Sequence, residues 1–401
     1  PQMWNPISSG TNLADLSNWV ATEKTRVIRP FKEFLVALNL DKNGTLYPHM
    51  VKTSHPALIG AVPSSWDETD TAKDVTEYEL TDVDTSPIRD GLALKDVFVI
   101  YKGRSTWGMQ WIGGQYIFRR FPMFMASGIL STHCVSALPD GMRHFVMTGD
   151  DLVVHNGQEA RSVVNRFWRQ YINNNMDTTN FDRSFTFINS LRTEAWFCFP
   201  LTDSTWPNVA VVWNYDTGAI GQRTLADTSF LAAGVVDDLD NTQWDQDTAS
   251  WASDDDPWNR EEFGPQGRDI LAADPTNTKL FQFDKTNQFN GTSFTAFVER
   301  QGLALVGQDR EGNPKVDFER RKLLRRIWPK ATGDAISVKV GSQDVLGGTV
   351  TWETAQTFTP GTDEYLDFTT NGKLLAVHFT SAADGHWELH GYDVDIELLG
   401  L

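Results

Sequence analysis

The sequence predicts an all-β protein, a β-propeller followed by a small C-terminal antiparallel β module, and two observations support this prediction. Short apolar, β-branched or aromatic runs recur along almost the whole chain. They include residues 34–40, 96–101, 144–148, 195–199, 209–214, 280–283, 336–340 and 374–379. Asn-Gly or Asp-Gly dipeptides stand near most of these runs, and both tolerate the positive φ angles of two-residue hairpin loops. The dipeptides begin at Asn43, Asp90, Asp140, Asn156, Asn290, Asn371 and Asp384.

The spacing of these units favours a propeller over residues 31–316. The units recur at irregular intervals, often near 50 residues, and a four-stranded blade takes about 40–50 residues. We therefore expect five to seven blades, with residues 278–284 and 292–299 in a fifth unit. Residues 161–172 predict one helix, which places Val164, Phe167, Trp168 and Tyr171 on a face that packs outside a blade.

The two ends of the chain are predicted to differ from the propeller. Residues 1–30 form an N-terminal lead-in with a short helical signal at 12–20, and we expect them to be the remnant of a longer chain. Residues 317–330 are a basic bridge. Residues 331–401 largely alternate polar and apolar side chains, which predicts a small sandwich-like β module.

The composition indicates a large globular protein, and no cofactor is expected. The chain has 401 residues, of which 40% are hydrophobic and fifteen are Trp. Two domains or more are expected at this length. Cys134 and Cys198 lie in apolar β-type runs and are predicted to be buried free thiols, with a single disulfide as the alternative. No signal peptide or apolar run of about 18 residues is present.

The net charge of −18 argues against a protein that reads nucleic-acid sequence, because such proteins present a basic face. It is compatible with a surface past which DNA slides, since a negative wall repels phosphates.

Residues 236–262 are the most acidic segment, with eight Asp, two Glu and one Arg. Trp244, Trp251 and Trp258 recur there every seven residues. Clustered carboxylates suit Ca²⁺, but the spacing does not match the EF-hand loop. We therefore predict a solvated insertion that these Trp side chains anchor on their own blade or on a neighbouring subunit, and we predict no metal site.

The basic bridge concentrates positive charge in an acidic chain. Arg320, Arg321, Lys322, Arg325, Arg326 and Lys330 outnumber Asp317 and Glu319 there. Phosphate contact and ordinary surface charge are alternatives, and pairing with acidic protein surface is favoured. The five basic residues from Arg320 to Arg326 are therefore predicted subunit contacts.

The search for catalytic motifs points to a protein that is not an enzyme. The sequence holds no His-Glu-x-x-His, Gly-x-Ser-x-Gly, P-loop, Gly-x-Gly-x-x-Gly or Cys-x-x-Cys motif. A glycosidase needs only two carboxylates, so the 53 acidic residues keep a carbohydrate-cleaving propeller open as an alternative.

The order of several loose motifs resembles the tail nozzle proteins of short-tailed bacteriophages, the tail tubular protein B-like group. In chain order the motifs occupy residues 143–158, 193–200, 208–215, the Trp-Asp insertion, 298–303, 371–379 and 387–394. The resemblance covers most of residues 30–401.

The resemblance implies a structural virion protein that is assembled in the host cytoplasm. Six copies would form a ring that contacts the tail adaptor and other tail proteins. The ring channel would retain the genomic DNA and then conduct it during ejection, without sequence-specific binding. The alternatives are a carbohydrate-binding or carbohydrate-cleaving propeller and a phage receptor-binding tail protein that contacts the host surface.

Overall fold

The computed structural model describes the chain except residues 4–12, 59, 82, 115, 236–267, 286–287, 290–291, 294, 309–313, 383–384 and 400–401. The described residues form two compact units, Pro1–Phe283 and Asp284–Leu401. Strands dominate both units, and one α-helix and one 3₁₀ helix are the helical elements of the described residues. The predicted all-β class is therefore confirmed. The described helices include none that is long and apolar enough to cross a membrane.

Unit 1 consists of five consecutive antiparallel sheets, in each of which neighbouring strands follow one another in the chain. The first sheet comprises β3 (Glu23–Phe31), β4 (Phe34–Lys42), β5 (Thr45–Thr53) and β6 (Thr76–Glu79). The second comprises β7 (Ile88–Leu94), β8 (Val97–Lys102), β9 (Thr106–Trp111) and β10 (Phe118–Phe124). The third comprises β11 (Val135–Ala137), β12 (His144–Met147), β13 (Leu152–His155) and β14 (Ala160–Ser162). The fourth comprises β15 (Phe185–Asn189), β16 (Glu194–Phe199), β17 (Val209–Asn214) and β18 (Ile220–Thr224), and the fifth β19 (Phe230–Val235), β20 (Arg268–Asp274) and β21 (Lys279–Gln282). A short pair, β1 (Gln2–Met3) and β2 (Ala14–Asp15), precedes them.

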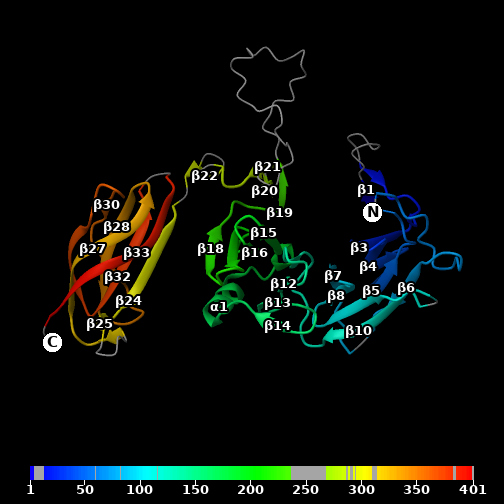
Figure 1. Cartoon of the computed structure of the whole chain (residues 1–401), viewed down its shortest axis with the longest axis horizontal. Coiled ribbons are helices and arrows are strands. Elements are labelled where there is room, and N and C mark those ends of the chain that lie inside the picture. The colour runs from blue at the N-terminus through cyan, green and yellow to red at the C-terminus, as the bar shows by residue number, and fades with distance from the viewer. Residues whose placement is uncertain are drawn as a thin grey trace, which may run out of the picture. The chain divides into compact units, whose positions relative to one another are not determined.

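These sheets are arranged as the blades of a β-propeller. The first strand of each sheet contacts the first strand of the next, in the order β3, β7, β11, β15 and β19. Figure 1 shows the blades following one another from blue to green. The first blade already begins at Glu23, within the predicted lead-in. Five blades in the described residues agree with the lower end of the predicted range.

Apolar side chains fill the spaces between neighbouring blades. Val36, Phe98 and Ile100 belong to a core shared by the first and second blades. Val99, Phe145 and Phe197 belong to a larger core that joins the second, third and fourth. A further core joins the fourth and fifth. The apolar runs of the sequence are therefore the strands that hold the blades together.

The predicted turns are confirmed where they connect paired strands. Asn43 and Gly44 adopt φ angles of 55° and 83° between β4 and β5. Asp140 and Gly141 form a turn between β11 and β12, in which the Asp140 carboxylate accepts a hydrogen bond from the Met142 N–H. Asn290-Gly291 and Asp384 lie outside the described residues.

Two predicted turns are wrong. Asp90 and Gly91 lie inside β7. There the Asp90 carboxylate is buried against Arg29, and the Phe98 ring packs directly on Gly91. A Cβ on Gly91 would lie 2.6 Å from that ring. Asn371 and Gly372 end a strand whose successor belongs to a different sheet, so they do not form a hairpin.

The predicted helix begins later than expected. Helix α1 spans Arg166–Asn175, because the Asn165 side chain accepts a hydrogen bond from the Trp168 N–H and so caps its N-terminus. Trp168 and Tyr171 pack on the core of the second to fourth blades, as predicted. Phe167 does not, because it is 66% exposed. The 3₁₀ helix η1 (Phe181–Arg183) follows.

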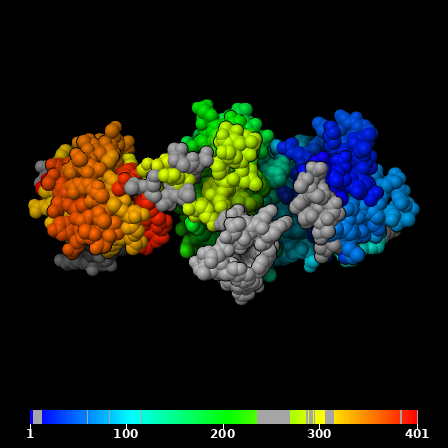
Figure 2. All heavy atoms as spheres, turned by 90° about the horizontal axis from the view of Figure 1, so that it is seen from above, coloured from blue at the N-terminus to red at the C-terminus, as the bar shows by residue number. Residues whose placement is uncertain are grey.

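Unit 2 is a sandwich of two antiparallel sheets around one core. One sheet has the order β24 (Phe297–Leu303), β32 (Leu374–Ser381), β28 (Ile336–Gln343), then β29 (Thr351–Trp352), with β30 (Gln356–Phe358) also on β28. The other has the order β31 (Leu366–Gly372), β27 (Lys322–Gly333) and β33 (Trp387–Leu398). Two short pairs complete the unit: β22 (Gln288–Phe289) with β23 (Thr292–Ser293), and β25 (Leu305–Gln308) with β26 (Pro314–Val316). Figure 2 shows the orange and red part of this unit as one body.

Two boundaries differ from the prediction. The units divide after Phe283 and not at residue 316. The predicted fifth unit is consequently split: β21 belongs to the propeller, whereas β24 pairs with β32 in unit 2. The predicted basic bridge is no linker either, because β27 pairs with both β31 and β33. Arg326 and Lys330 alternate with the buried Ile327 and Pro329, which is the pattern of a strand with one solvent-facing side, whereas Lys322 is itself buried.

A buried carboxylate connects the inner strands of the propeller. Asp90 on β7 is fully buried and receives two hydrogen bonds from the Arg29 guanidinium on β3, at 3.0 and 2.8 Å. The backbone N–H groups of Gly91 and His133 donate to the same carboxylate. The His133 ring then contacts Phe230 on β19, with the centroids 5.4 Å apart. One charged group thus links parts of the first, second and third blades.

We predict that Asp90→Asn destabilises the protein by about 3 kcal/mol, because breaking a buried pair leaves the Arg29 charge without its partner. The shift of the urea unfolding midpoint measures this. Asp96→Asn is the matched control, because the Asp96 side chain is 81% exposed in its pair with Lys32. Equal midpoints for the two variants would contradict the structural role of Asp90.

Candidate functional site

The predicted subunit contacts of the basic segment have partners within unit 2. Arg325 pairs with Glu397. Arg326 pairs with Asp367 at 2.7 Å, and its guanidinium also lies 3.7 Å from the centroid of the Tyr365 ring. These pairs lie on the outer face of the three-stranded sheet. They compensate the acidic side chains of β31 and β33, and subunit contact by these arginines stays a prediction.

The other two arginines of the segment behave in the same way. Arg321 pairs with Asp344 at 3.0 Å and donates to the Asn371 side chain. Arg320 lies 3.6 Å from Asp317. All four guanidinium groups are at least 36% exposed, so a partner chain can still reach them.

Lys322 differs from its neighbours because it is fully buried. Its ammonium group donates to three backbone carbonyls, those of Asp317, Arg320 and Lys373. Burial lowers the pKa of this side chain, and the Asp317 carboxylate opposes that shift. An ammonium group has three N–H donors, and all three are used here. Lys322 therefore holds the start of β27 in place and does not face a partner.

Trp244, Trp251 and Trp258, with the whole insertion at 236–262, lie outside the described residues. Their prediction as contact residues remains a prediction. Among the described residues, no group of three or more His, Cys, Asp or Glu side chains is arranged to hold a metal ion.

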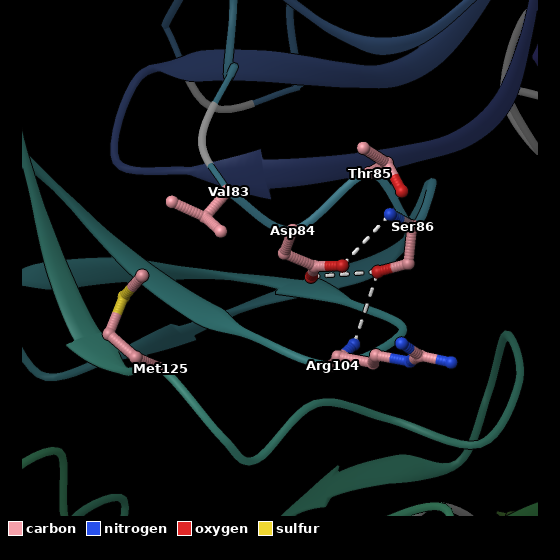
Figure 3. Close-up of a pocket in the computed structure, with 6 residues that line it drawn as sticks. All are labelled: Val83, Asp84, Thr85, Ser86, Arg104 and Met125. Carbon is pink, nitrogen blue, oxygen red and sulfur yellow. Dashed lines mark hydrogen bonds between the residues drawn. The ribbon is translucent and has the colours of Figure 1, made fainter.

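An open pocket of about 400 Å³ lies in unit 1 beside the β8–β9 hairpin. Figure 3 shows Val83, Thr85, Arg104 and Met125 around a pair of polar residues, Asp84 and Ser86. The Asp84 carboxylate accepts hydrogen bonds from the Ser86 hydroxyl at 2.7 Å and from the Ser105 hydroxyl at 2.8 Å. The Ser86 hydroxyl in turn accepts from the Arg104 N–H.

These hydrogen bonds determine what the pocket can do. Burial alone would raise the pKa of Asp84, but hydrogen bonds from Ser86 and Ser105 and the nearby Lys102 ammonium lower it instead. The Asp84 carboxylate is ionised at neutral pH, and the hydroxyl groups of Ser86 and Ser105 donate hydrogen bonds to it. Among the described residues that line the pocket, there is no histidine that could activate either hydroxyl. The polar groups therefore close the loop before β7 and form no nucleophile–base pair.

A second polar cluster is buried where the second and third blades meet. The Nε2 atom of His144 donates to the Ala93 carbonyl at 2.9 Å, so its Nδ1 accepts from the Tyr101 hydroxyl at 2.8 Å. That hydroxyl accepts from Nε2 of His155 at 2.6 Å. The Gly157 N–H donates to the remaining ring nitrogen. Every polar atom of the cluster is paired when both imidazoles are neutral.

Burial fixes the protonation state of this cluster. It lowers the pKa of His144 to about 4, against a weaker opposing effect of the Ala93 carbonyl. It lowers the pKa of His155 to about 3, and His144 adds to that shift. Burial also raises the pKa of Tyr101 well above its ordinary value. No substrate can reach groups that are this deeply buried, so the cluster serves the fold.

The two cysteines are buried free thiols, as predicted. Burial raises the pKa of Cys134 to about 12 and raises the pKa of Cys198 as well. Neither thiol forms the thiolate that a nucleophile or a metal ligand requires.

Two surface features were missed in the sequence. The β9–β10 hairpin exposes Trp111, Ile112 and Tyr116, and the outer face of the five-stranded sheet carries Phe297 and Trp352. Gly113 and Gly114, which lie between Trp111 and Tyr116, could have indicated the exposed hairpin. The aromatic face of unit 2 depends on strand neighbours that are far apart in the sequence.

No protein-family model matches the chain, and no curated protein matches it. Solved structures with some likeness include a putative 6-phosphogluconolactonase from Bacteroides uniformis, at 11% identity and a TM-score of 0.32 over 63% of this chain and 81% of that one. An exo-β-1,3-galactanase from Phanerochaete chrysosporium has 8% identity and a TM-score of 0.27, over 90% of this chain and 79% of that one. Values this low carry no argument about activity. The class of the protein follows from its own sheets: a β-propeller joined to a β-sandwich module.

We predict that Lys322→Met destabilises the protein by about 2 kcal/mol, because three buried carbonyl groups lose their donor. Thermal and urea unfolding measure the change. Lys330→Met serves as the control, since Lys330 is 61% exposed in its pair with Asp393. If both variants unfold at the wild-type midpoint, Lys322 does not anchor β27.

The buried histidines also predict acid sensitivity. Their folded pKa values lie below the ordinary 6.5, so the unfolded chain takes up protons first as the pH falls. Their contribution to stability is complete above about pH 6.5 and is lost towards pH 4 and 3, at about 1.4 kcal/mol per pH unit for each histidine.

The urea unfolding free energy measured between pH 7 and pH 4.5 tests this dependence. The His144→Gln, His155→Gln double variant should show a shallower slope than the wild type, whatever its stability at pH 7. An unchanged slope would show that other groups cause the acid sensitivity.

Proposed function

We propose that the chain is a structural, non-enzymatic subunit of a ring in the tail of a short-tailed bacteriophage, of the nozzle type. The ring would retain the genomic DNA and conduct it during ejection. The order of motifs along the chain supports this proposal, and so does one surface feature of unit 1 that suits assembly. The proposal requires no cofactor.

The observation that carries the proposal is the exposed tip of the β9–β10 hairpin. Trp111 is 46% exposed, Ile112 52% and Tyr116 75%. Gly113 and Gly114, with φ angles of 70° and 73°, make the tight turn that brings these side chains to the tip. Large apolar side chains that gather on a surface mark contact sites for other proteins, and aromatic residues dominate such contacts energetically.

The surroundings of this tip are basic. The Lys32 ammonium lies 5.5 Å from the centroid of the Trp111 ring, and Arg119 extends from the neighbouring edge strand β10. Residues 88–124 carry a net charge of +4 in a chain of net charge −18. Aromatic and arginine side chains together are typical of interface cores and their rims.

An acidic surface suited to this patch lies on the same unit. Residues 67–79 carry six carboxylates and one lysine, and Asp67, Asp70, Asp74 and Glu79 are exposed. A ring needs two different, complementary patches on each subunit, because each copy contacts its neighbours head to tail. We infer that the hairpin tip of one copy meets the acidic loop of the next.

The excess of negative charge suits a DNA conduit. A negative wall repels phosphates and keeps the polymer from binding. The proposal therefore includes passage of DNA without sequence-specific contacts. It also includes a location in the virion and contacts with the tail adaptor and other tail proteins.

The symmetry of the purified protein tests the proposal. Electron-microscopy class averages should show a sixfold ring with an open channel. The double variant Trp111→Ala, Tyr116→Ala should lose the ring and appear as monomers in light scattering. Its melting temperature should stay close to that of the wild type, because exposed side chains contribute little to folding.

Leu46→Ala is the matched control, since Leu46 is 72% exposed on another hairpin of the same unit. Rings that persist in the double variant would remove the hairpin from the interface. A wild-type monomer would favour a carbohydrate-active propeller instead, and a trimer would favour a receptor-binding protein.

A further inference from the structure

The outer face of the five-stranded sheet of unit 2 carries a set of side chains that the proposed ring does not use. Glu299, His378 and Lys339 lie side by side, because they are register partners on β24, β32 and β28. Figure 1 shows these three strands together in unit 2. Core residues such as Val338 and Phe379 alternate with this row along the strands. The row therefore points away from the core.

Two aromatic rings flank the central histidine. The Phe297 ring stacks on His378, with centroids 5.5 Å apart and planes inclined by 16°. The Trp352 indole meets the same imidazole edge to face, at 5.7 Å and 67°. Phe297 is 64% exposed, although it lies on an edge strand beside an ionisable row.

A glycine makes room for the indole. Trp352 is the register partner of Gly341 on β28. A Cβ on Gly341 would lie 2.8 Å from the Cε3 atom of this indole. The absence of a side chain at position 341 thus lets Trp352 reach across the sheet towards His378.

The polar groups of the row are only partly paired, because the Glu299 carboxylate accepts one hydrogen bond, from the Gln301 side chain, and keeps its other acceptor positions. Among the described residues, the buried Nδ1 atom of His378 has no hydrogen-bond partner. Its Nε2 atom lies 3.8 Å from the Glu299 carboxylate, too far for a hydrogen bond. Lys339 forms no ion pair with any described residue. Such groups beside aromatic rings are the usual composition of a site for a small polar ligand.

We propose that this face, formed by Phe297, Glu299, Lys339, Trp352 and His378, binds an oligosaccharide chain. A sugar ring presents C–H groups on one side, and these are attracted to the negative face of an aromatic ring. Its hydroxyl groups both donate and accept hydrogen bonds. Glu299 accepts, Lys339 donates, and the Nε2 atom of His378 adds one more polar group, whereas its Nδ1 atom is buried. The row thus matches the ligand group by group.

The charges on the face favour a neutral oligosaccharide over a phosphate polymer and over a protein partner. One carboxylate and one ammonium group cancel, which suits a neutral chain better than a phosphate polymer. Unit 2 also has a net charge of −5 over residues 284–401, which repels polyanions. The core of a protein interface is depleted of charged residues, whereas here the ionisable row occupies the centre.

Saturation-transfer NMR on the full chain tests the proposal. The ligands are hexasaccharides of glucose, galactose and N-acetylglucosamine, each added alone. At least one should bind the wild type. Phe297→Ala and Trp352→Ala should each weaken that binding by about tenfold or more, which is a loss of about 1.4 kcal/mol. Glu299→Gln should weaken it less, since the amide still accepts a hydrogen bond.

Tyr365→Ala is the matched control. Tyr365 is an exposed aromatic residue of the same unit that contacts Trp328, outside this face, and should not affect binding. Melting temperatures verify that each variant folds. Failure of all hexasaccharides to bind the wild type would overturn the proposal, as would unchanged binding by both aromatic variants. Ring assembly is scored separately, so the failure of either proposal leaves the other standing.

Discussion

The buried charge of Asp90 aligns the first three blades of the propeller. Each blade contacts its neighbours through apolar side chains, which hold the blades together without fixing their alignment, because apolar contact is not directional. The Asp90 carboxylate fixes the alignment of the blades, because its hydrogen bonds are directional. Its carboxylate is fully buried and has to be paired, so Arg29 of the first blade and the His133 backbone before the third must approach it from fixed sides. The positive φ of His133, 67°, is part of that geometry.

The neutral Tyr101, His144 and His155 cluster adds a second directional link between the second and third blades.

Unit 2 shows how the two outer faces of a sandwich acquire different roles. On the three-stranded sheet, the arginines of β27 pair with carboxylates of β31 and β33, so this face satisfies its own charges. On the five-stranded sheet, the row of Glu299, His378 and Lys339 is flanked by two aromatic rings and is only partly paired within the unit. The first face stabilises and solubilises the unit. The second is available to a ligand.

The two proposals place assembly and recognition on different units. The hairpin tip at Trp111 and the acidic loop at 67–79 lie on the propeller, whereas the glycan face lies on the sandwich. Under the proposed function, a subunit would contact its neighbours through one unit and keep the other unit available for a ligand. The exposed groups of the two sites share no residue, which allows each to be altered without the other.

The sequence by itself determined the all-β class, many of the strands and the buried thiols, because period-two alternation and turn dipeptides are local signals. It did not reveal the place of the basic segment. Lys322 and Arg326 look alike in the sequence, yet one is buried against three carbonyls and the other pairs on the surface. Asp90-Gly91 likewise looks like a turn. Its role inside β7 follows from Arg29, which is distant in sequence. The glycan face joins residues from 297 to 378 by strand register. Only the tertiary structure decides these points, because burial and register depend on strands that the chain brings together from afar.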